Sequence, residues 1–147
     1  MRGMRGMRDT LLKAAMVIVA GLAAAATAPS RAQSPAPAPD GKALFLKNCA
    51  ACHQATGKGI PGAFPALAGS KFVTGEHADV ATVLLKGRGG MPDFSENISD
   101  ADMAAILTYV RSSWGNKADA LTEAEVLKLR DTLGVAHFGS AEMSNKH

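Results

Sequence analysis

The densest cluster of reactive side chains is Cys49-Ala50-Ala51-Cys52-His53, which contains both cysteines of the 147-residue chain. On a helix, thiols at this spacing lie about one turn apart. Two such thiols followed directly by a histidine form the C-x-x-C-H pattern of c-type haem attachment. Each thiol can add to one vinyl group of the porphyrin, and the adjacent imidazole then faces the iron. The motif predicts one haem c, bound covalently through Cys49 and Cys52 and ligated by His53.

Three other uses of two cysteines fit the sequence less well. A thioredoxin-like redox pair occurs in a βαβ context, and no such pattern surrounds Cys49 and Cys52. A structural zinc site needs four ligands, and the sequence has no second cysteine pair or histidine pair at a suitable spacing. A disulfide between the two cysteines would close a very short loop and would stabilise the fold little.

The second iron ligand is expected to be Met91. This residue lies in a Gly-rich loop 38 residues after His53, where the chain can fold over the far face of the haem. Met103 falls on the apolar face of a predicted helix, where methionine usually fills the core. Met143 lies near the end of the chain, and His77 is the main competing ligand.

A histidine and a methionine together would occupy both axial positions of the iron. Thioether ligation raises the reduction potential, and a fully ligated iron offers no position for peroxide or oxygen. The pair His53 and Met91 therefore predicts one-electron transfer rather than catalysis, and we expect no catalytic residues.

The sequence predicts an all-α fold, because no stretch of alternating β-branched residues indicates a sheet. Apolar positions at helical spacing and N-capping residues predict four helices. The first helix covers 41–52 with Asp40 as its N-cap, and the second covers 76–86 and ends at Gly87. The third begins at Ser99 and is stopped by Gly115, and the fourth covers 122–133 with Thr122 as its cap.

The chain is predicted to divide into four parts. Residues 1–32 form a basic and then uncharged signal peptide, cleaved after Ala32, which predicts export to the periplasm. An uncleaved signal that anchors the protein in the membrane is the alternative. Residues 33–39 form a Pro/Ala-rich tether, 40–115 the haem domain, and 116–147 a helical extension with a polar tail.

The extension is predicted to pack back on the haem domain through its apolar positions. These are Val126, Leu127, Leu129 and Leu133. The charged residues are predicted to face outward. These are Glu123, Glu125, Lys128, Arg130 and Asp131.

The distribution of charge argues against nucleic-acid binding. Residues 1–32 hold five of the 16 basic and one of the 13 acidic residues, which leaves 11 basic and 12 acidic residues in 33–147. The predicted mature chain therefore lacks the excess of positive charge that attracts phosphate backbones.

Residues 40–115 resemble a class I, single-haem bacterial cytochrome c. The resemblance lies in Gly41, Phe45, Cys49–His53, Phe64–Leu67, Gly90–Pro92 and Leu107–Val110. It implies a small helical shell around the covalently attached haem, in which the first and last helices of the domain cross. The shorter run 109–116 and the stretch 122–130 are similar to the small cytochromes and cytochrome subunits found alongside periplasmic dehydrogenases.

The resemblance also implies roles for individual residues. Gly41 would allow the close approach of the crossing helices, and Phe45 would pack against Leu107 or Val110. Pro65 matches the loop proline whose carbonyl accepts the Nδ1–H of the axial histidine. Other residues could border the haem or belong to the ordinary core and surface: Leu67, Phe72, Phe94, Lys86, Arg88 and Trp114.

The expected function is that of an exported, monomeric electron carrier between periplasmic redox proteins, such as a dehydrogenase donor and an oxidase or reductase acceptor. The alternative is a cytochrome c subunit of a membrane-associated dehydrogenase or oxidase complex. A haem peroxidase or a sensor, in which Met91 does not bind the iron, is the remaining possibility.

Overall fold

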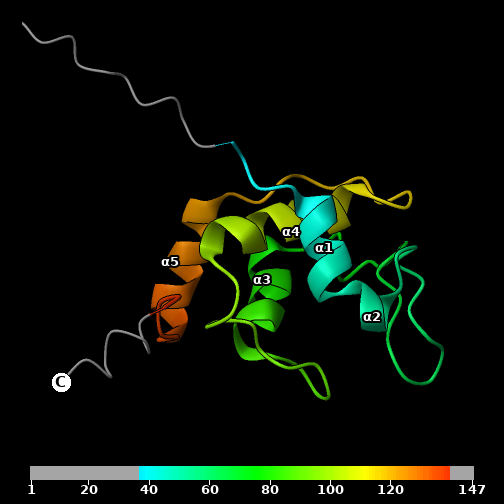
Figure 1. Cartoon of the computed structure of the whole chain (residues 1–147), viewed down its shortest axis with the longest axis horizontal. Coiled ribbons are helices and arrows are strands. Elements are labelled where there is room, and N and C mark those ends of the chain that lie inside the picture. The colour runs from blue at the N-terminus through cyan, green and yellow to red at the C-terminus, as the bar shows by residue number, and fades with distance from the viewer. Residues whose placement is uncertain (1–36, 140–147) are drawn as a thin grey trace, which may run out of the picture. The chain divides into compact units, whose positions relative to one another are not determined.

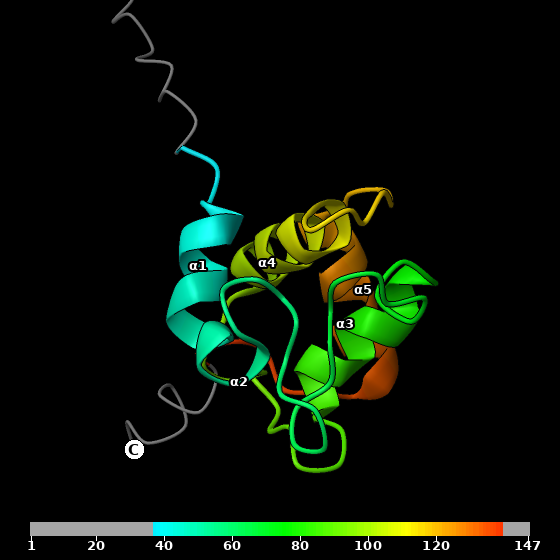
Figure 2. The same ribbon diagram turned by 90° about the vertical axis from the view of Figure 1, so that its right-hand side faces the viewer.

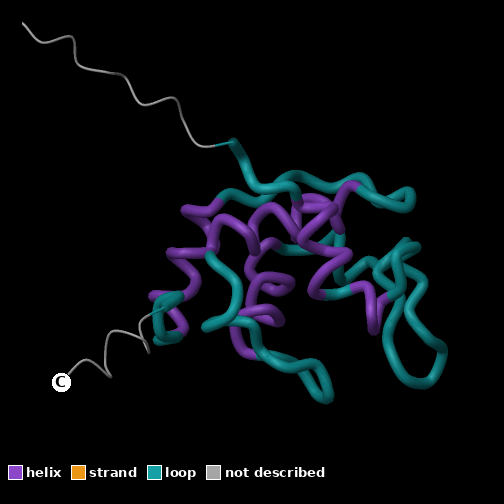
Figure 3. Tube along the Cα trace, in the orientation of Figure 1, coloured by secondary structure: helices purple, strands orange, loops and turns teal. Residues whose placement is uncertain are grey.

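The structure is a computed structural model that describes residues 37–139. This part of the chain contains five helices and no strands, which confirms the predicted all-α class (Figures 1 and 3). Two isolated β-bridges, at Ile60 with Phe64 and at Arg88 with Met91, close loops between the helices. The helices are α1 (Gly41–Asn48), α2 (Ala50–His53), α3 (His77–Lys86), α4 (Asp100–Ser112) and α5 (Glu123–Leu133).

Side-chain caps begin three of these helices where the sequence predicts them. The Asp40 carboxylate accepts two backbone N–H groups in the first turn of α1. The Ser99 hydroxyl accepts one at the start of α4. Thr122 and Glu125 form a reciprocal capping box at the start of α5. Such caps satisfy backbone donors that the first turn leaves without helical partners.

The predicted helix over 41–52 is interrupted at Cys49. This residue has φ −122° and ψ −29°, so the chain bends between α1 and α2. The bend keeps its hydrogen bonds, because the Cys49 N–H donates to the Phe45 carbonyl and the His53 N–H donates to the Cys49 carbonyl, each at 2.9 Å. The axis of α2, which carries Cys52 and His53, therefore differs in direction from that of α1.

The ends of α3 and α4 follow from backbone conformation. α3 ends as predicted at Gly87, because a φ of 72° is incompatible with a right-handed helix. α4 ends earlier than predicted, because Ser113 is already extended. Trp114 and Gly115 then both have positive φ, which turns the chain sharply before the extension.

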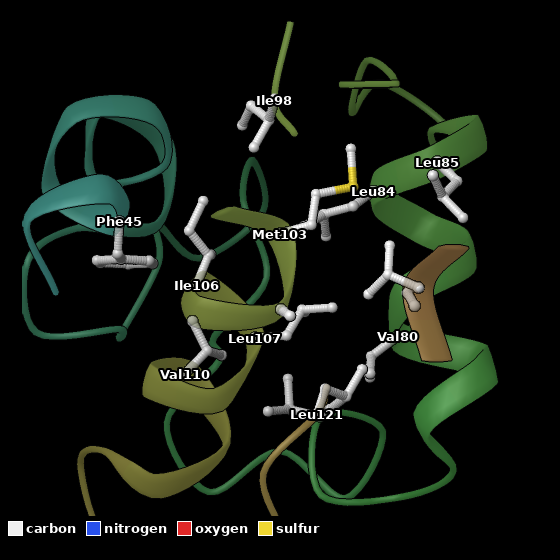
Figure 4. Close-up of a cluster of buried hydrophobic side chains, with 14 residues drawn as sticks. Phe45, Val80, Leu84, Leu85, Ile98, Met103, Ile106, Leu107, Val110 and Leu121 are labelled. Carbon is white, nitrogen blue, oxygen red and sulfur yellow. The ribbon is translucent and has the colours of Figure 1, made fainter. Parts of the chain in front are cut away.

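Helices α1, α3 and α4 enclose one hydrophobic core, which α5 extends (Figure 4). Its members come from every helix except α2 and from the loops that follow α2, α3 and α4. The completely enclosed side chains are those of Phe45, Leu85, Met103, Ile106, Val126 and, unexpectedly, Arg130.

The tightest helix contact is the crossing of α1 and α4, which lie side by side in Figures 1 and 2. Gly41 makes this crossing possible, since a Cβ at this position would overlap the Ala105 carbonyl oxygen. Phe45 faces the same contact, and its ring lies 5.5 Å from that of Tyr109 and 5.1 Å from that of Trp114. The predicted close approach at Gly41 is confirmed, and the ring partners of Phe45 are aromatic.

Gly41→Ala is expected to lower the free energy of unfolding by about 1–3 kcal/mol, because the added methyl group meets rigid backbone. Denaturant unfolding measures the change. Gly90→Ala is the matched control, since a Cβ there would meet nothing within 4 Å. Equal stabilities of the two variants would contradict this account of the crossing.

Helix α5 packs against α4 and α3, as predicted for the extension. The orientation predicted for Arg130 is wrong, however. Its side chain is 0% exposed, and its guanidinium pairs with the Asp100 carboxylate at 2.7 Å. The carboxylate comes from 30 residues earlier in the chain, so the local amphipathic pattern of α5 gives no sign of it. Leu127, predicted to be apolar and inward, is 39% exposed.

A second polar contact joins α3 to α5. The Nδ1 of His77 and the Glu125 carboxylate are 2.9 Å apart. The hydrogen bond from His77, followed by those from the backbone and side chain of Thr122, lowers the pKa of Glu125 to about 2. The imidazole of His77 is thus engaged at the surface between two helices.

Several predictions fall outside the described residues. They are the signal peptide with its cleavage site after Ala32, most of the tether, and the positions of Met143 and His147. Within residues 37–139, no helix has the length and apolar character to cross a membrane.

Candidate functional site

The three residues of the C-x-x-C-H motif lie together around α2. Cys49 is half-buried at its start, Cys52 is exposed one turn later, and His53 ends the helix with 7% exposure. Both cysteines are free thiols. The fold therefore presents one accessible and one partly covered sulfur beside an imidazole that is largely withdrawn from solvent.

The imidazole of His53 is fixed by the backbone of the following loop. Its Nδ1 lies 3.0 Å from the Pro65 carbonyl oxygen. A carbonyl oxygen can only accept, so Nδ1 carries the proton and donates it. The lone pair of the neutral ring is then on Nε2, which is the nitrogen free to bind a metal. Pro65 thus lies where the sequence resemblance requires it.

The loop between His53 and Pro65 depends on Gly59. This glycine has φ +61°, and its N–H donates to the His53 carbonyl at 3.0 Å. A Cβ at Gly59 would overlap the Phe64 carbonyl oxygen and crowd that of Pro65. The absence of a side chain therefore lets the Pro65 carbonyl reach the imidazole. The sequence analysis missed Gly59, although its position in a Gly/Pro-rich loop after the motif was a usable signal.

Cys49 does not have the character of a nucleophilic redox thiol. Burial, followed by the proximity of Cys52, raises the pKa of Cys49 to about 11. Catalytic disulfide exchange requires the opposite shift, since the thiolate is the nucleophile. At neutral pH Cys49 is a protonated thiol, the form whose S–H adds across a vinyl double bond.

Met91 lies in the loop between α3 and α4. Its backbone pairs with that of Arg88 through two 3.0 Å hydrogen bonds, and its side chain is half-buried against the core. Among the described residues, no hydrogen bond joins Met91 to His53. In Figures 1 and 2 this loop and α2 both lie on the lower side of the molecule.

The competing ligands have other surroundings. Met103 is 0% exposed on α4 and is part of the core. His77 is paired with Glu125 between α3 and α5. Met91 is thus the described candidate that lies in a loop and is partly accessible.

The apolar and charged residues that could border a haem take several positions. Leu67 and Phe94 pack against the core. Phe72 is 41% exposed, and the Arg88 guanidinium lies 4.7 Å from its ring centroid. Lys86 is exposed. Trp114 lies against Phe45 and Tyr109, and its Nε1–H donates to the Ala55 carbonyl, so it fastens the loop after His53 to the end of α4.

Asn116 is a buried polar residue that the sequence analysis missed. Its side-chain amide donates to the carbonyls of Leu67 and Val110 at 3.0 and 2.8 Å and accepts the Gly69 N–H at 2.8 Å. It thereby holds the loop after Pro65 against the end of α4. No local pattern distinguishes it from a surface asparagine.

The donor set suits haem c. Two free thiols one turn apart can form the thioethers, and the Nδ1 bond of His53 leaves Nε2 available for the iron. The thioether of Met91 would supply a further ligand to the iron. No group of three or more His, Cys, Asp or Glu side chains within residues 37–139 gathers in the manner of a zinc site.

Comparison with known proteins gives a family match over about half of the chain. Residues 36–110 match the family described as cytochrome c oxidase, cbb3-type, subunit III. The match includes α1–α3 and most of α4 and ends before α5.

The individual relatives include a cytochrome c subunit of a dehydrogenase and two cytochromes that carry names of their own. The chain is 36% identical to the cytochrome c subunit of a quinone alcohol dehydrogenase from Gluconacetobacter polyoxogenes, over 63% of its own length and 22% of the relative. It is 31% identical to cytochrome c-552 of Thermus thermophilus, over 62% of its length and 84% of that protein. It is 36% identical to cytochrome c6 of a Synechocystis strain, over 48% of its length and 60% of the relative.

Proposed function

We propose that this chain carries single electrons between redox proteins. It belongs to the family described as cytochrome c oxidase, cbb3-type, subunit III, and has the class I cytochrome c fold. The observation that carries the proposal is the 3.0 Å contact between His53 Nδ1 and the Pro65 carbonyl. It fixes the tautomer and the direction of an imidazole that directly follows two free thiols.

Each residue of the site has a distinct role in this proposal. Cys49 and Cys52 would hold one haem covalently, His53 would bind the iron through Nε2, and the Pro65 carbonyl orients the imidazole. Met91, in the loop between α3 and α4, would supply its thioether as a further ligand to the iron. When bound, the haem supplies a one-electron ferric–ferrous couple, whose potential the thioether raises.

The same ligand set argues for a carrier rather than an enzyme. Methionine and histidine together would leave no axial position open for a substrate. The chain itself would hold and orient the group and exclude water from it with the loops after α2 and α3. We therefore infer no catalytic residue.

We infer that the protein works after export, in the periplasm, because residues 1–32 have the composition of a signal peptide. Its partners would be a dehydrogenase donor and an oxidase or reductase acceptor. The second candidate is a subunit of a membrane-associated dehydrogenase complex, favoured by the 36% identity to an alcohol dehydrogenase cytochrome c subunit. The chain spans only 22% of that subunit.

The ferric absorption spectrum of the purified protein tests the proposal. A low-spin spectrum with a methionine–iron charge-transfer band, and a reversible one-electron redox titration, are the expected results. A high-spin spectrum at neutral pH would instead favour a peroxidase or sensor. Elution without detergent as a single chain, no larger than the 15.1 kDa of the full sequence, would favour the free carrier over the subunit.

A further inference from the structure

We propose that Arg130 is a positioning residue for Met91. From helix α5, beyond the part of the chain that matches the family, its buried guanidinium holds the loop that carries the methionine. This inference rests on the proposed function, in which Met91 binds the haem iron.

The guanidinium of Arg130 joins three segments of the chain. Its Nε donates to the Asp100 carboxylate at 2.8 Å, at the start of α4. Its Nη1 donates to the Ser95 carbonyl at 3.1 Å and also to the Ala136 carbonyl. The side chain is 0% exposed, so these bonds are made away from water. A planar fork of donors suits such a site, and a lysine ammonium does not.

Ser95 belongs to the same loop as Met91, four residues later. Two hydrogen bonds tie this part of the loop to helices. The Phe94 N–H donates to the Leu84 carbonyl of α3 at 2.7 Å, and Ser95 accepts from Arg130. Ser95 is itself buried at 7% exposure, and its hydroxyl donates to Asp93. Arg130 therefore provides one of the two hydrogen bonds to helices between Met91 and the start of α4.

Loss of the Arg130–Ser95 hydrogen bond would raise the fraction of molecules in which Met91 is displaced from the iron. Without the guanidinium, the buried Ser95 carbonyl has no partner, and the loop can regain hydrogen bonds only by moving toward water. An external ligand such as imidazole binds ferric iron only when the methionine has left. Its apparent affinity is therefore proportional to the fraction of molecules in which the loop is open.

The test compares three variants of the full haem-loaded protein: Arg130→Met, Arg130→Lys and the control Arg111→Met. Arg111 is also buried, at 3% exposure, but it donates to the carbonyls of Val73, Gly75 and Asp119, outside the methionine loop. Imidazole titration of the ferric protein measures loop opening. The two Arg130 variants are expected to bind imidazole at least about tenfold more tightly than the parent, and Arg111→Met within about twofold of it.

Hydrogen exchange gives a readout that does not depend on iron ligation. In the Arg130 variants, faster exchange is expected over residues 91–98, with little change over 67–75. If Arg130→Met yields no haem-loaded protein, Arg130→Lys decides, because it keeps the cation beside Asp100 but not the fork.

Unchanged imidazole affinity and unchanged exchange in the Arg130 variants would overturn the proposal. So would an equal effect of Arg111→Met, since it would indicate a general loss of stability. A parent protein without the methionine–iron band would refute the proposed function itself, and that result is read before any variant is made.

Discussion

Replacing Cys52 with alanine is expected to reduce the amount of haem bound covalently to the chain by roughly tenfold or more. The variant can form at most one thioether, since Cys49 is the only other cysteine. Cys52 is the exposed thiol of the pair, so its removal leaves the core unchanged. The haem content per chain after purification from a maturation-competent host measures the effect.

Ala51→Ser is the matched control for this prediction. Ala51 is exposed on the same turn of α2, so the substitution makes a change of similar size without touching a thiol. It is expected to keep the parental haem content. Parental haem content in Cys52→Ala would refute the role of the motif.

The second large effect is expected from Met91→Ala. The substitution removes the proposed axial thioether and leaves the iron with one protein ligand. The methionine–iron band should vanish, and the reduction potential should fall because the thioether is lost. Imidazole should bind at least about a hundredfold more tightly, because imidazole then no longer competes with the methionine for the iron. Optical titration of the ferric protein measures both the band and the affinity.

Met103→Ala separates ligation from packing. Met103 is 0% exposed in the core, so its truncation should lower the free energy of unfolding by about 2–5 kcal/mol. The iron spectrum should stay that of the parent. If Met103→Ala loses the band and Met91→Ala retains it, the assignment of the ligand is wrong.

The parts of the fold that sequence could predict depend on neighbours in the chain. A cap such as Asp40 or Thr122 acts on backbone N–H groups two or three residues later, so its partner is already visible in the sequence. Gly87 ends α3 through its own conformation. The motif at Cys49–His53 is equally local, because one turn of helix sets the spacing of its thiols.

The parts that sequence could not predict depend on distant partners. Arg130 looks like a solvent-facing residue of an amphipathic helix until Asp100 and the Ser95 carbonyl are placed beside it. Asn116 likewise can be recognised as a buried hydrogen-bonding residue only when the carbonyls of Leu67 and Val110 are placed beside it. The bend at Cys49 costs no hydrogen bond, so nothing in the local pattern marks it.

The family match and the contacts of Arg130 involve different parts of the chain. Residues 36–110 contain every proposed haem ligand. The helix α5 lies outside the match, yet its Arg130 reaches back to the methionine loop. The extension would thus belong to the haem site through the backbone that it holds.

The most direct test of the central claim is the state of the haem in the denatured protein. Acidified acetone extracts haem that is held only by coordination, whereas thioether-bound haem stays with the polypeptide. The account predicts one haem per chain that resists extraction and gives the alkaline pyridine spectrum of haem c. A colourless protein from a maturation-competent host, or haem that leaves with the solvent, would contradict it.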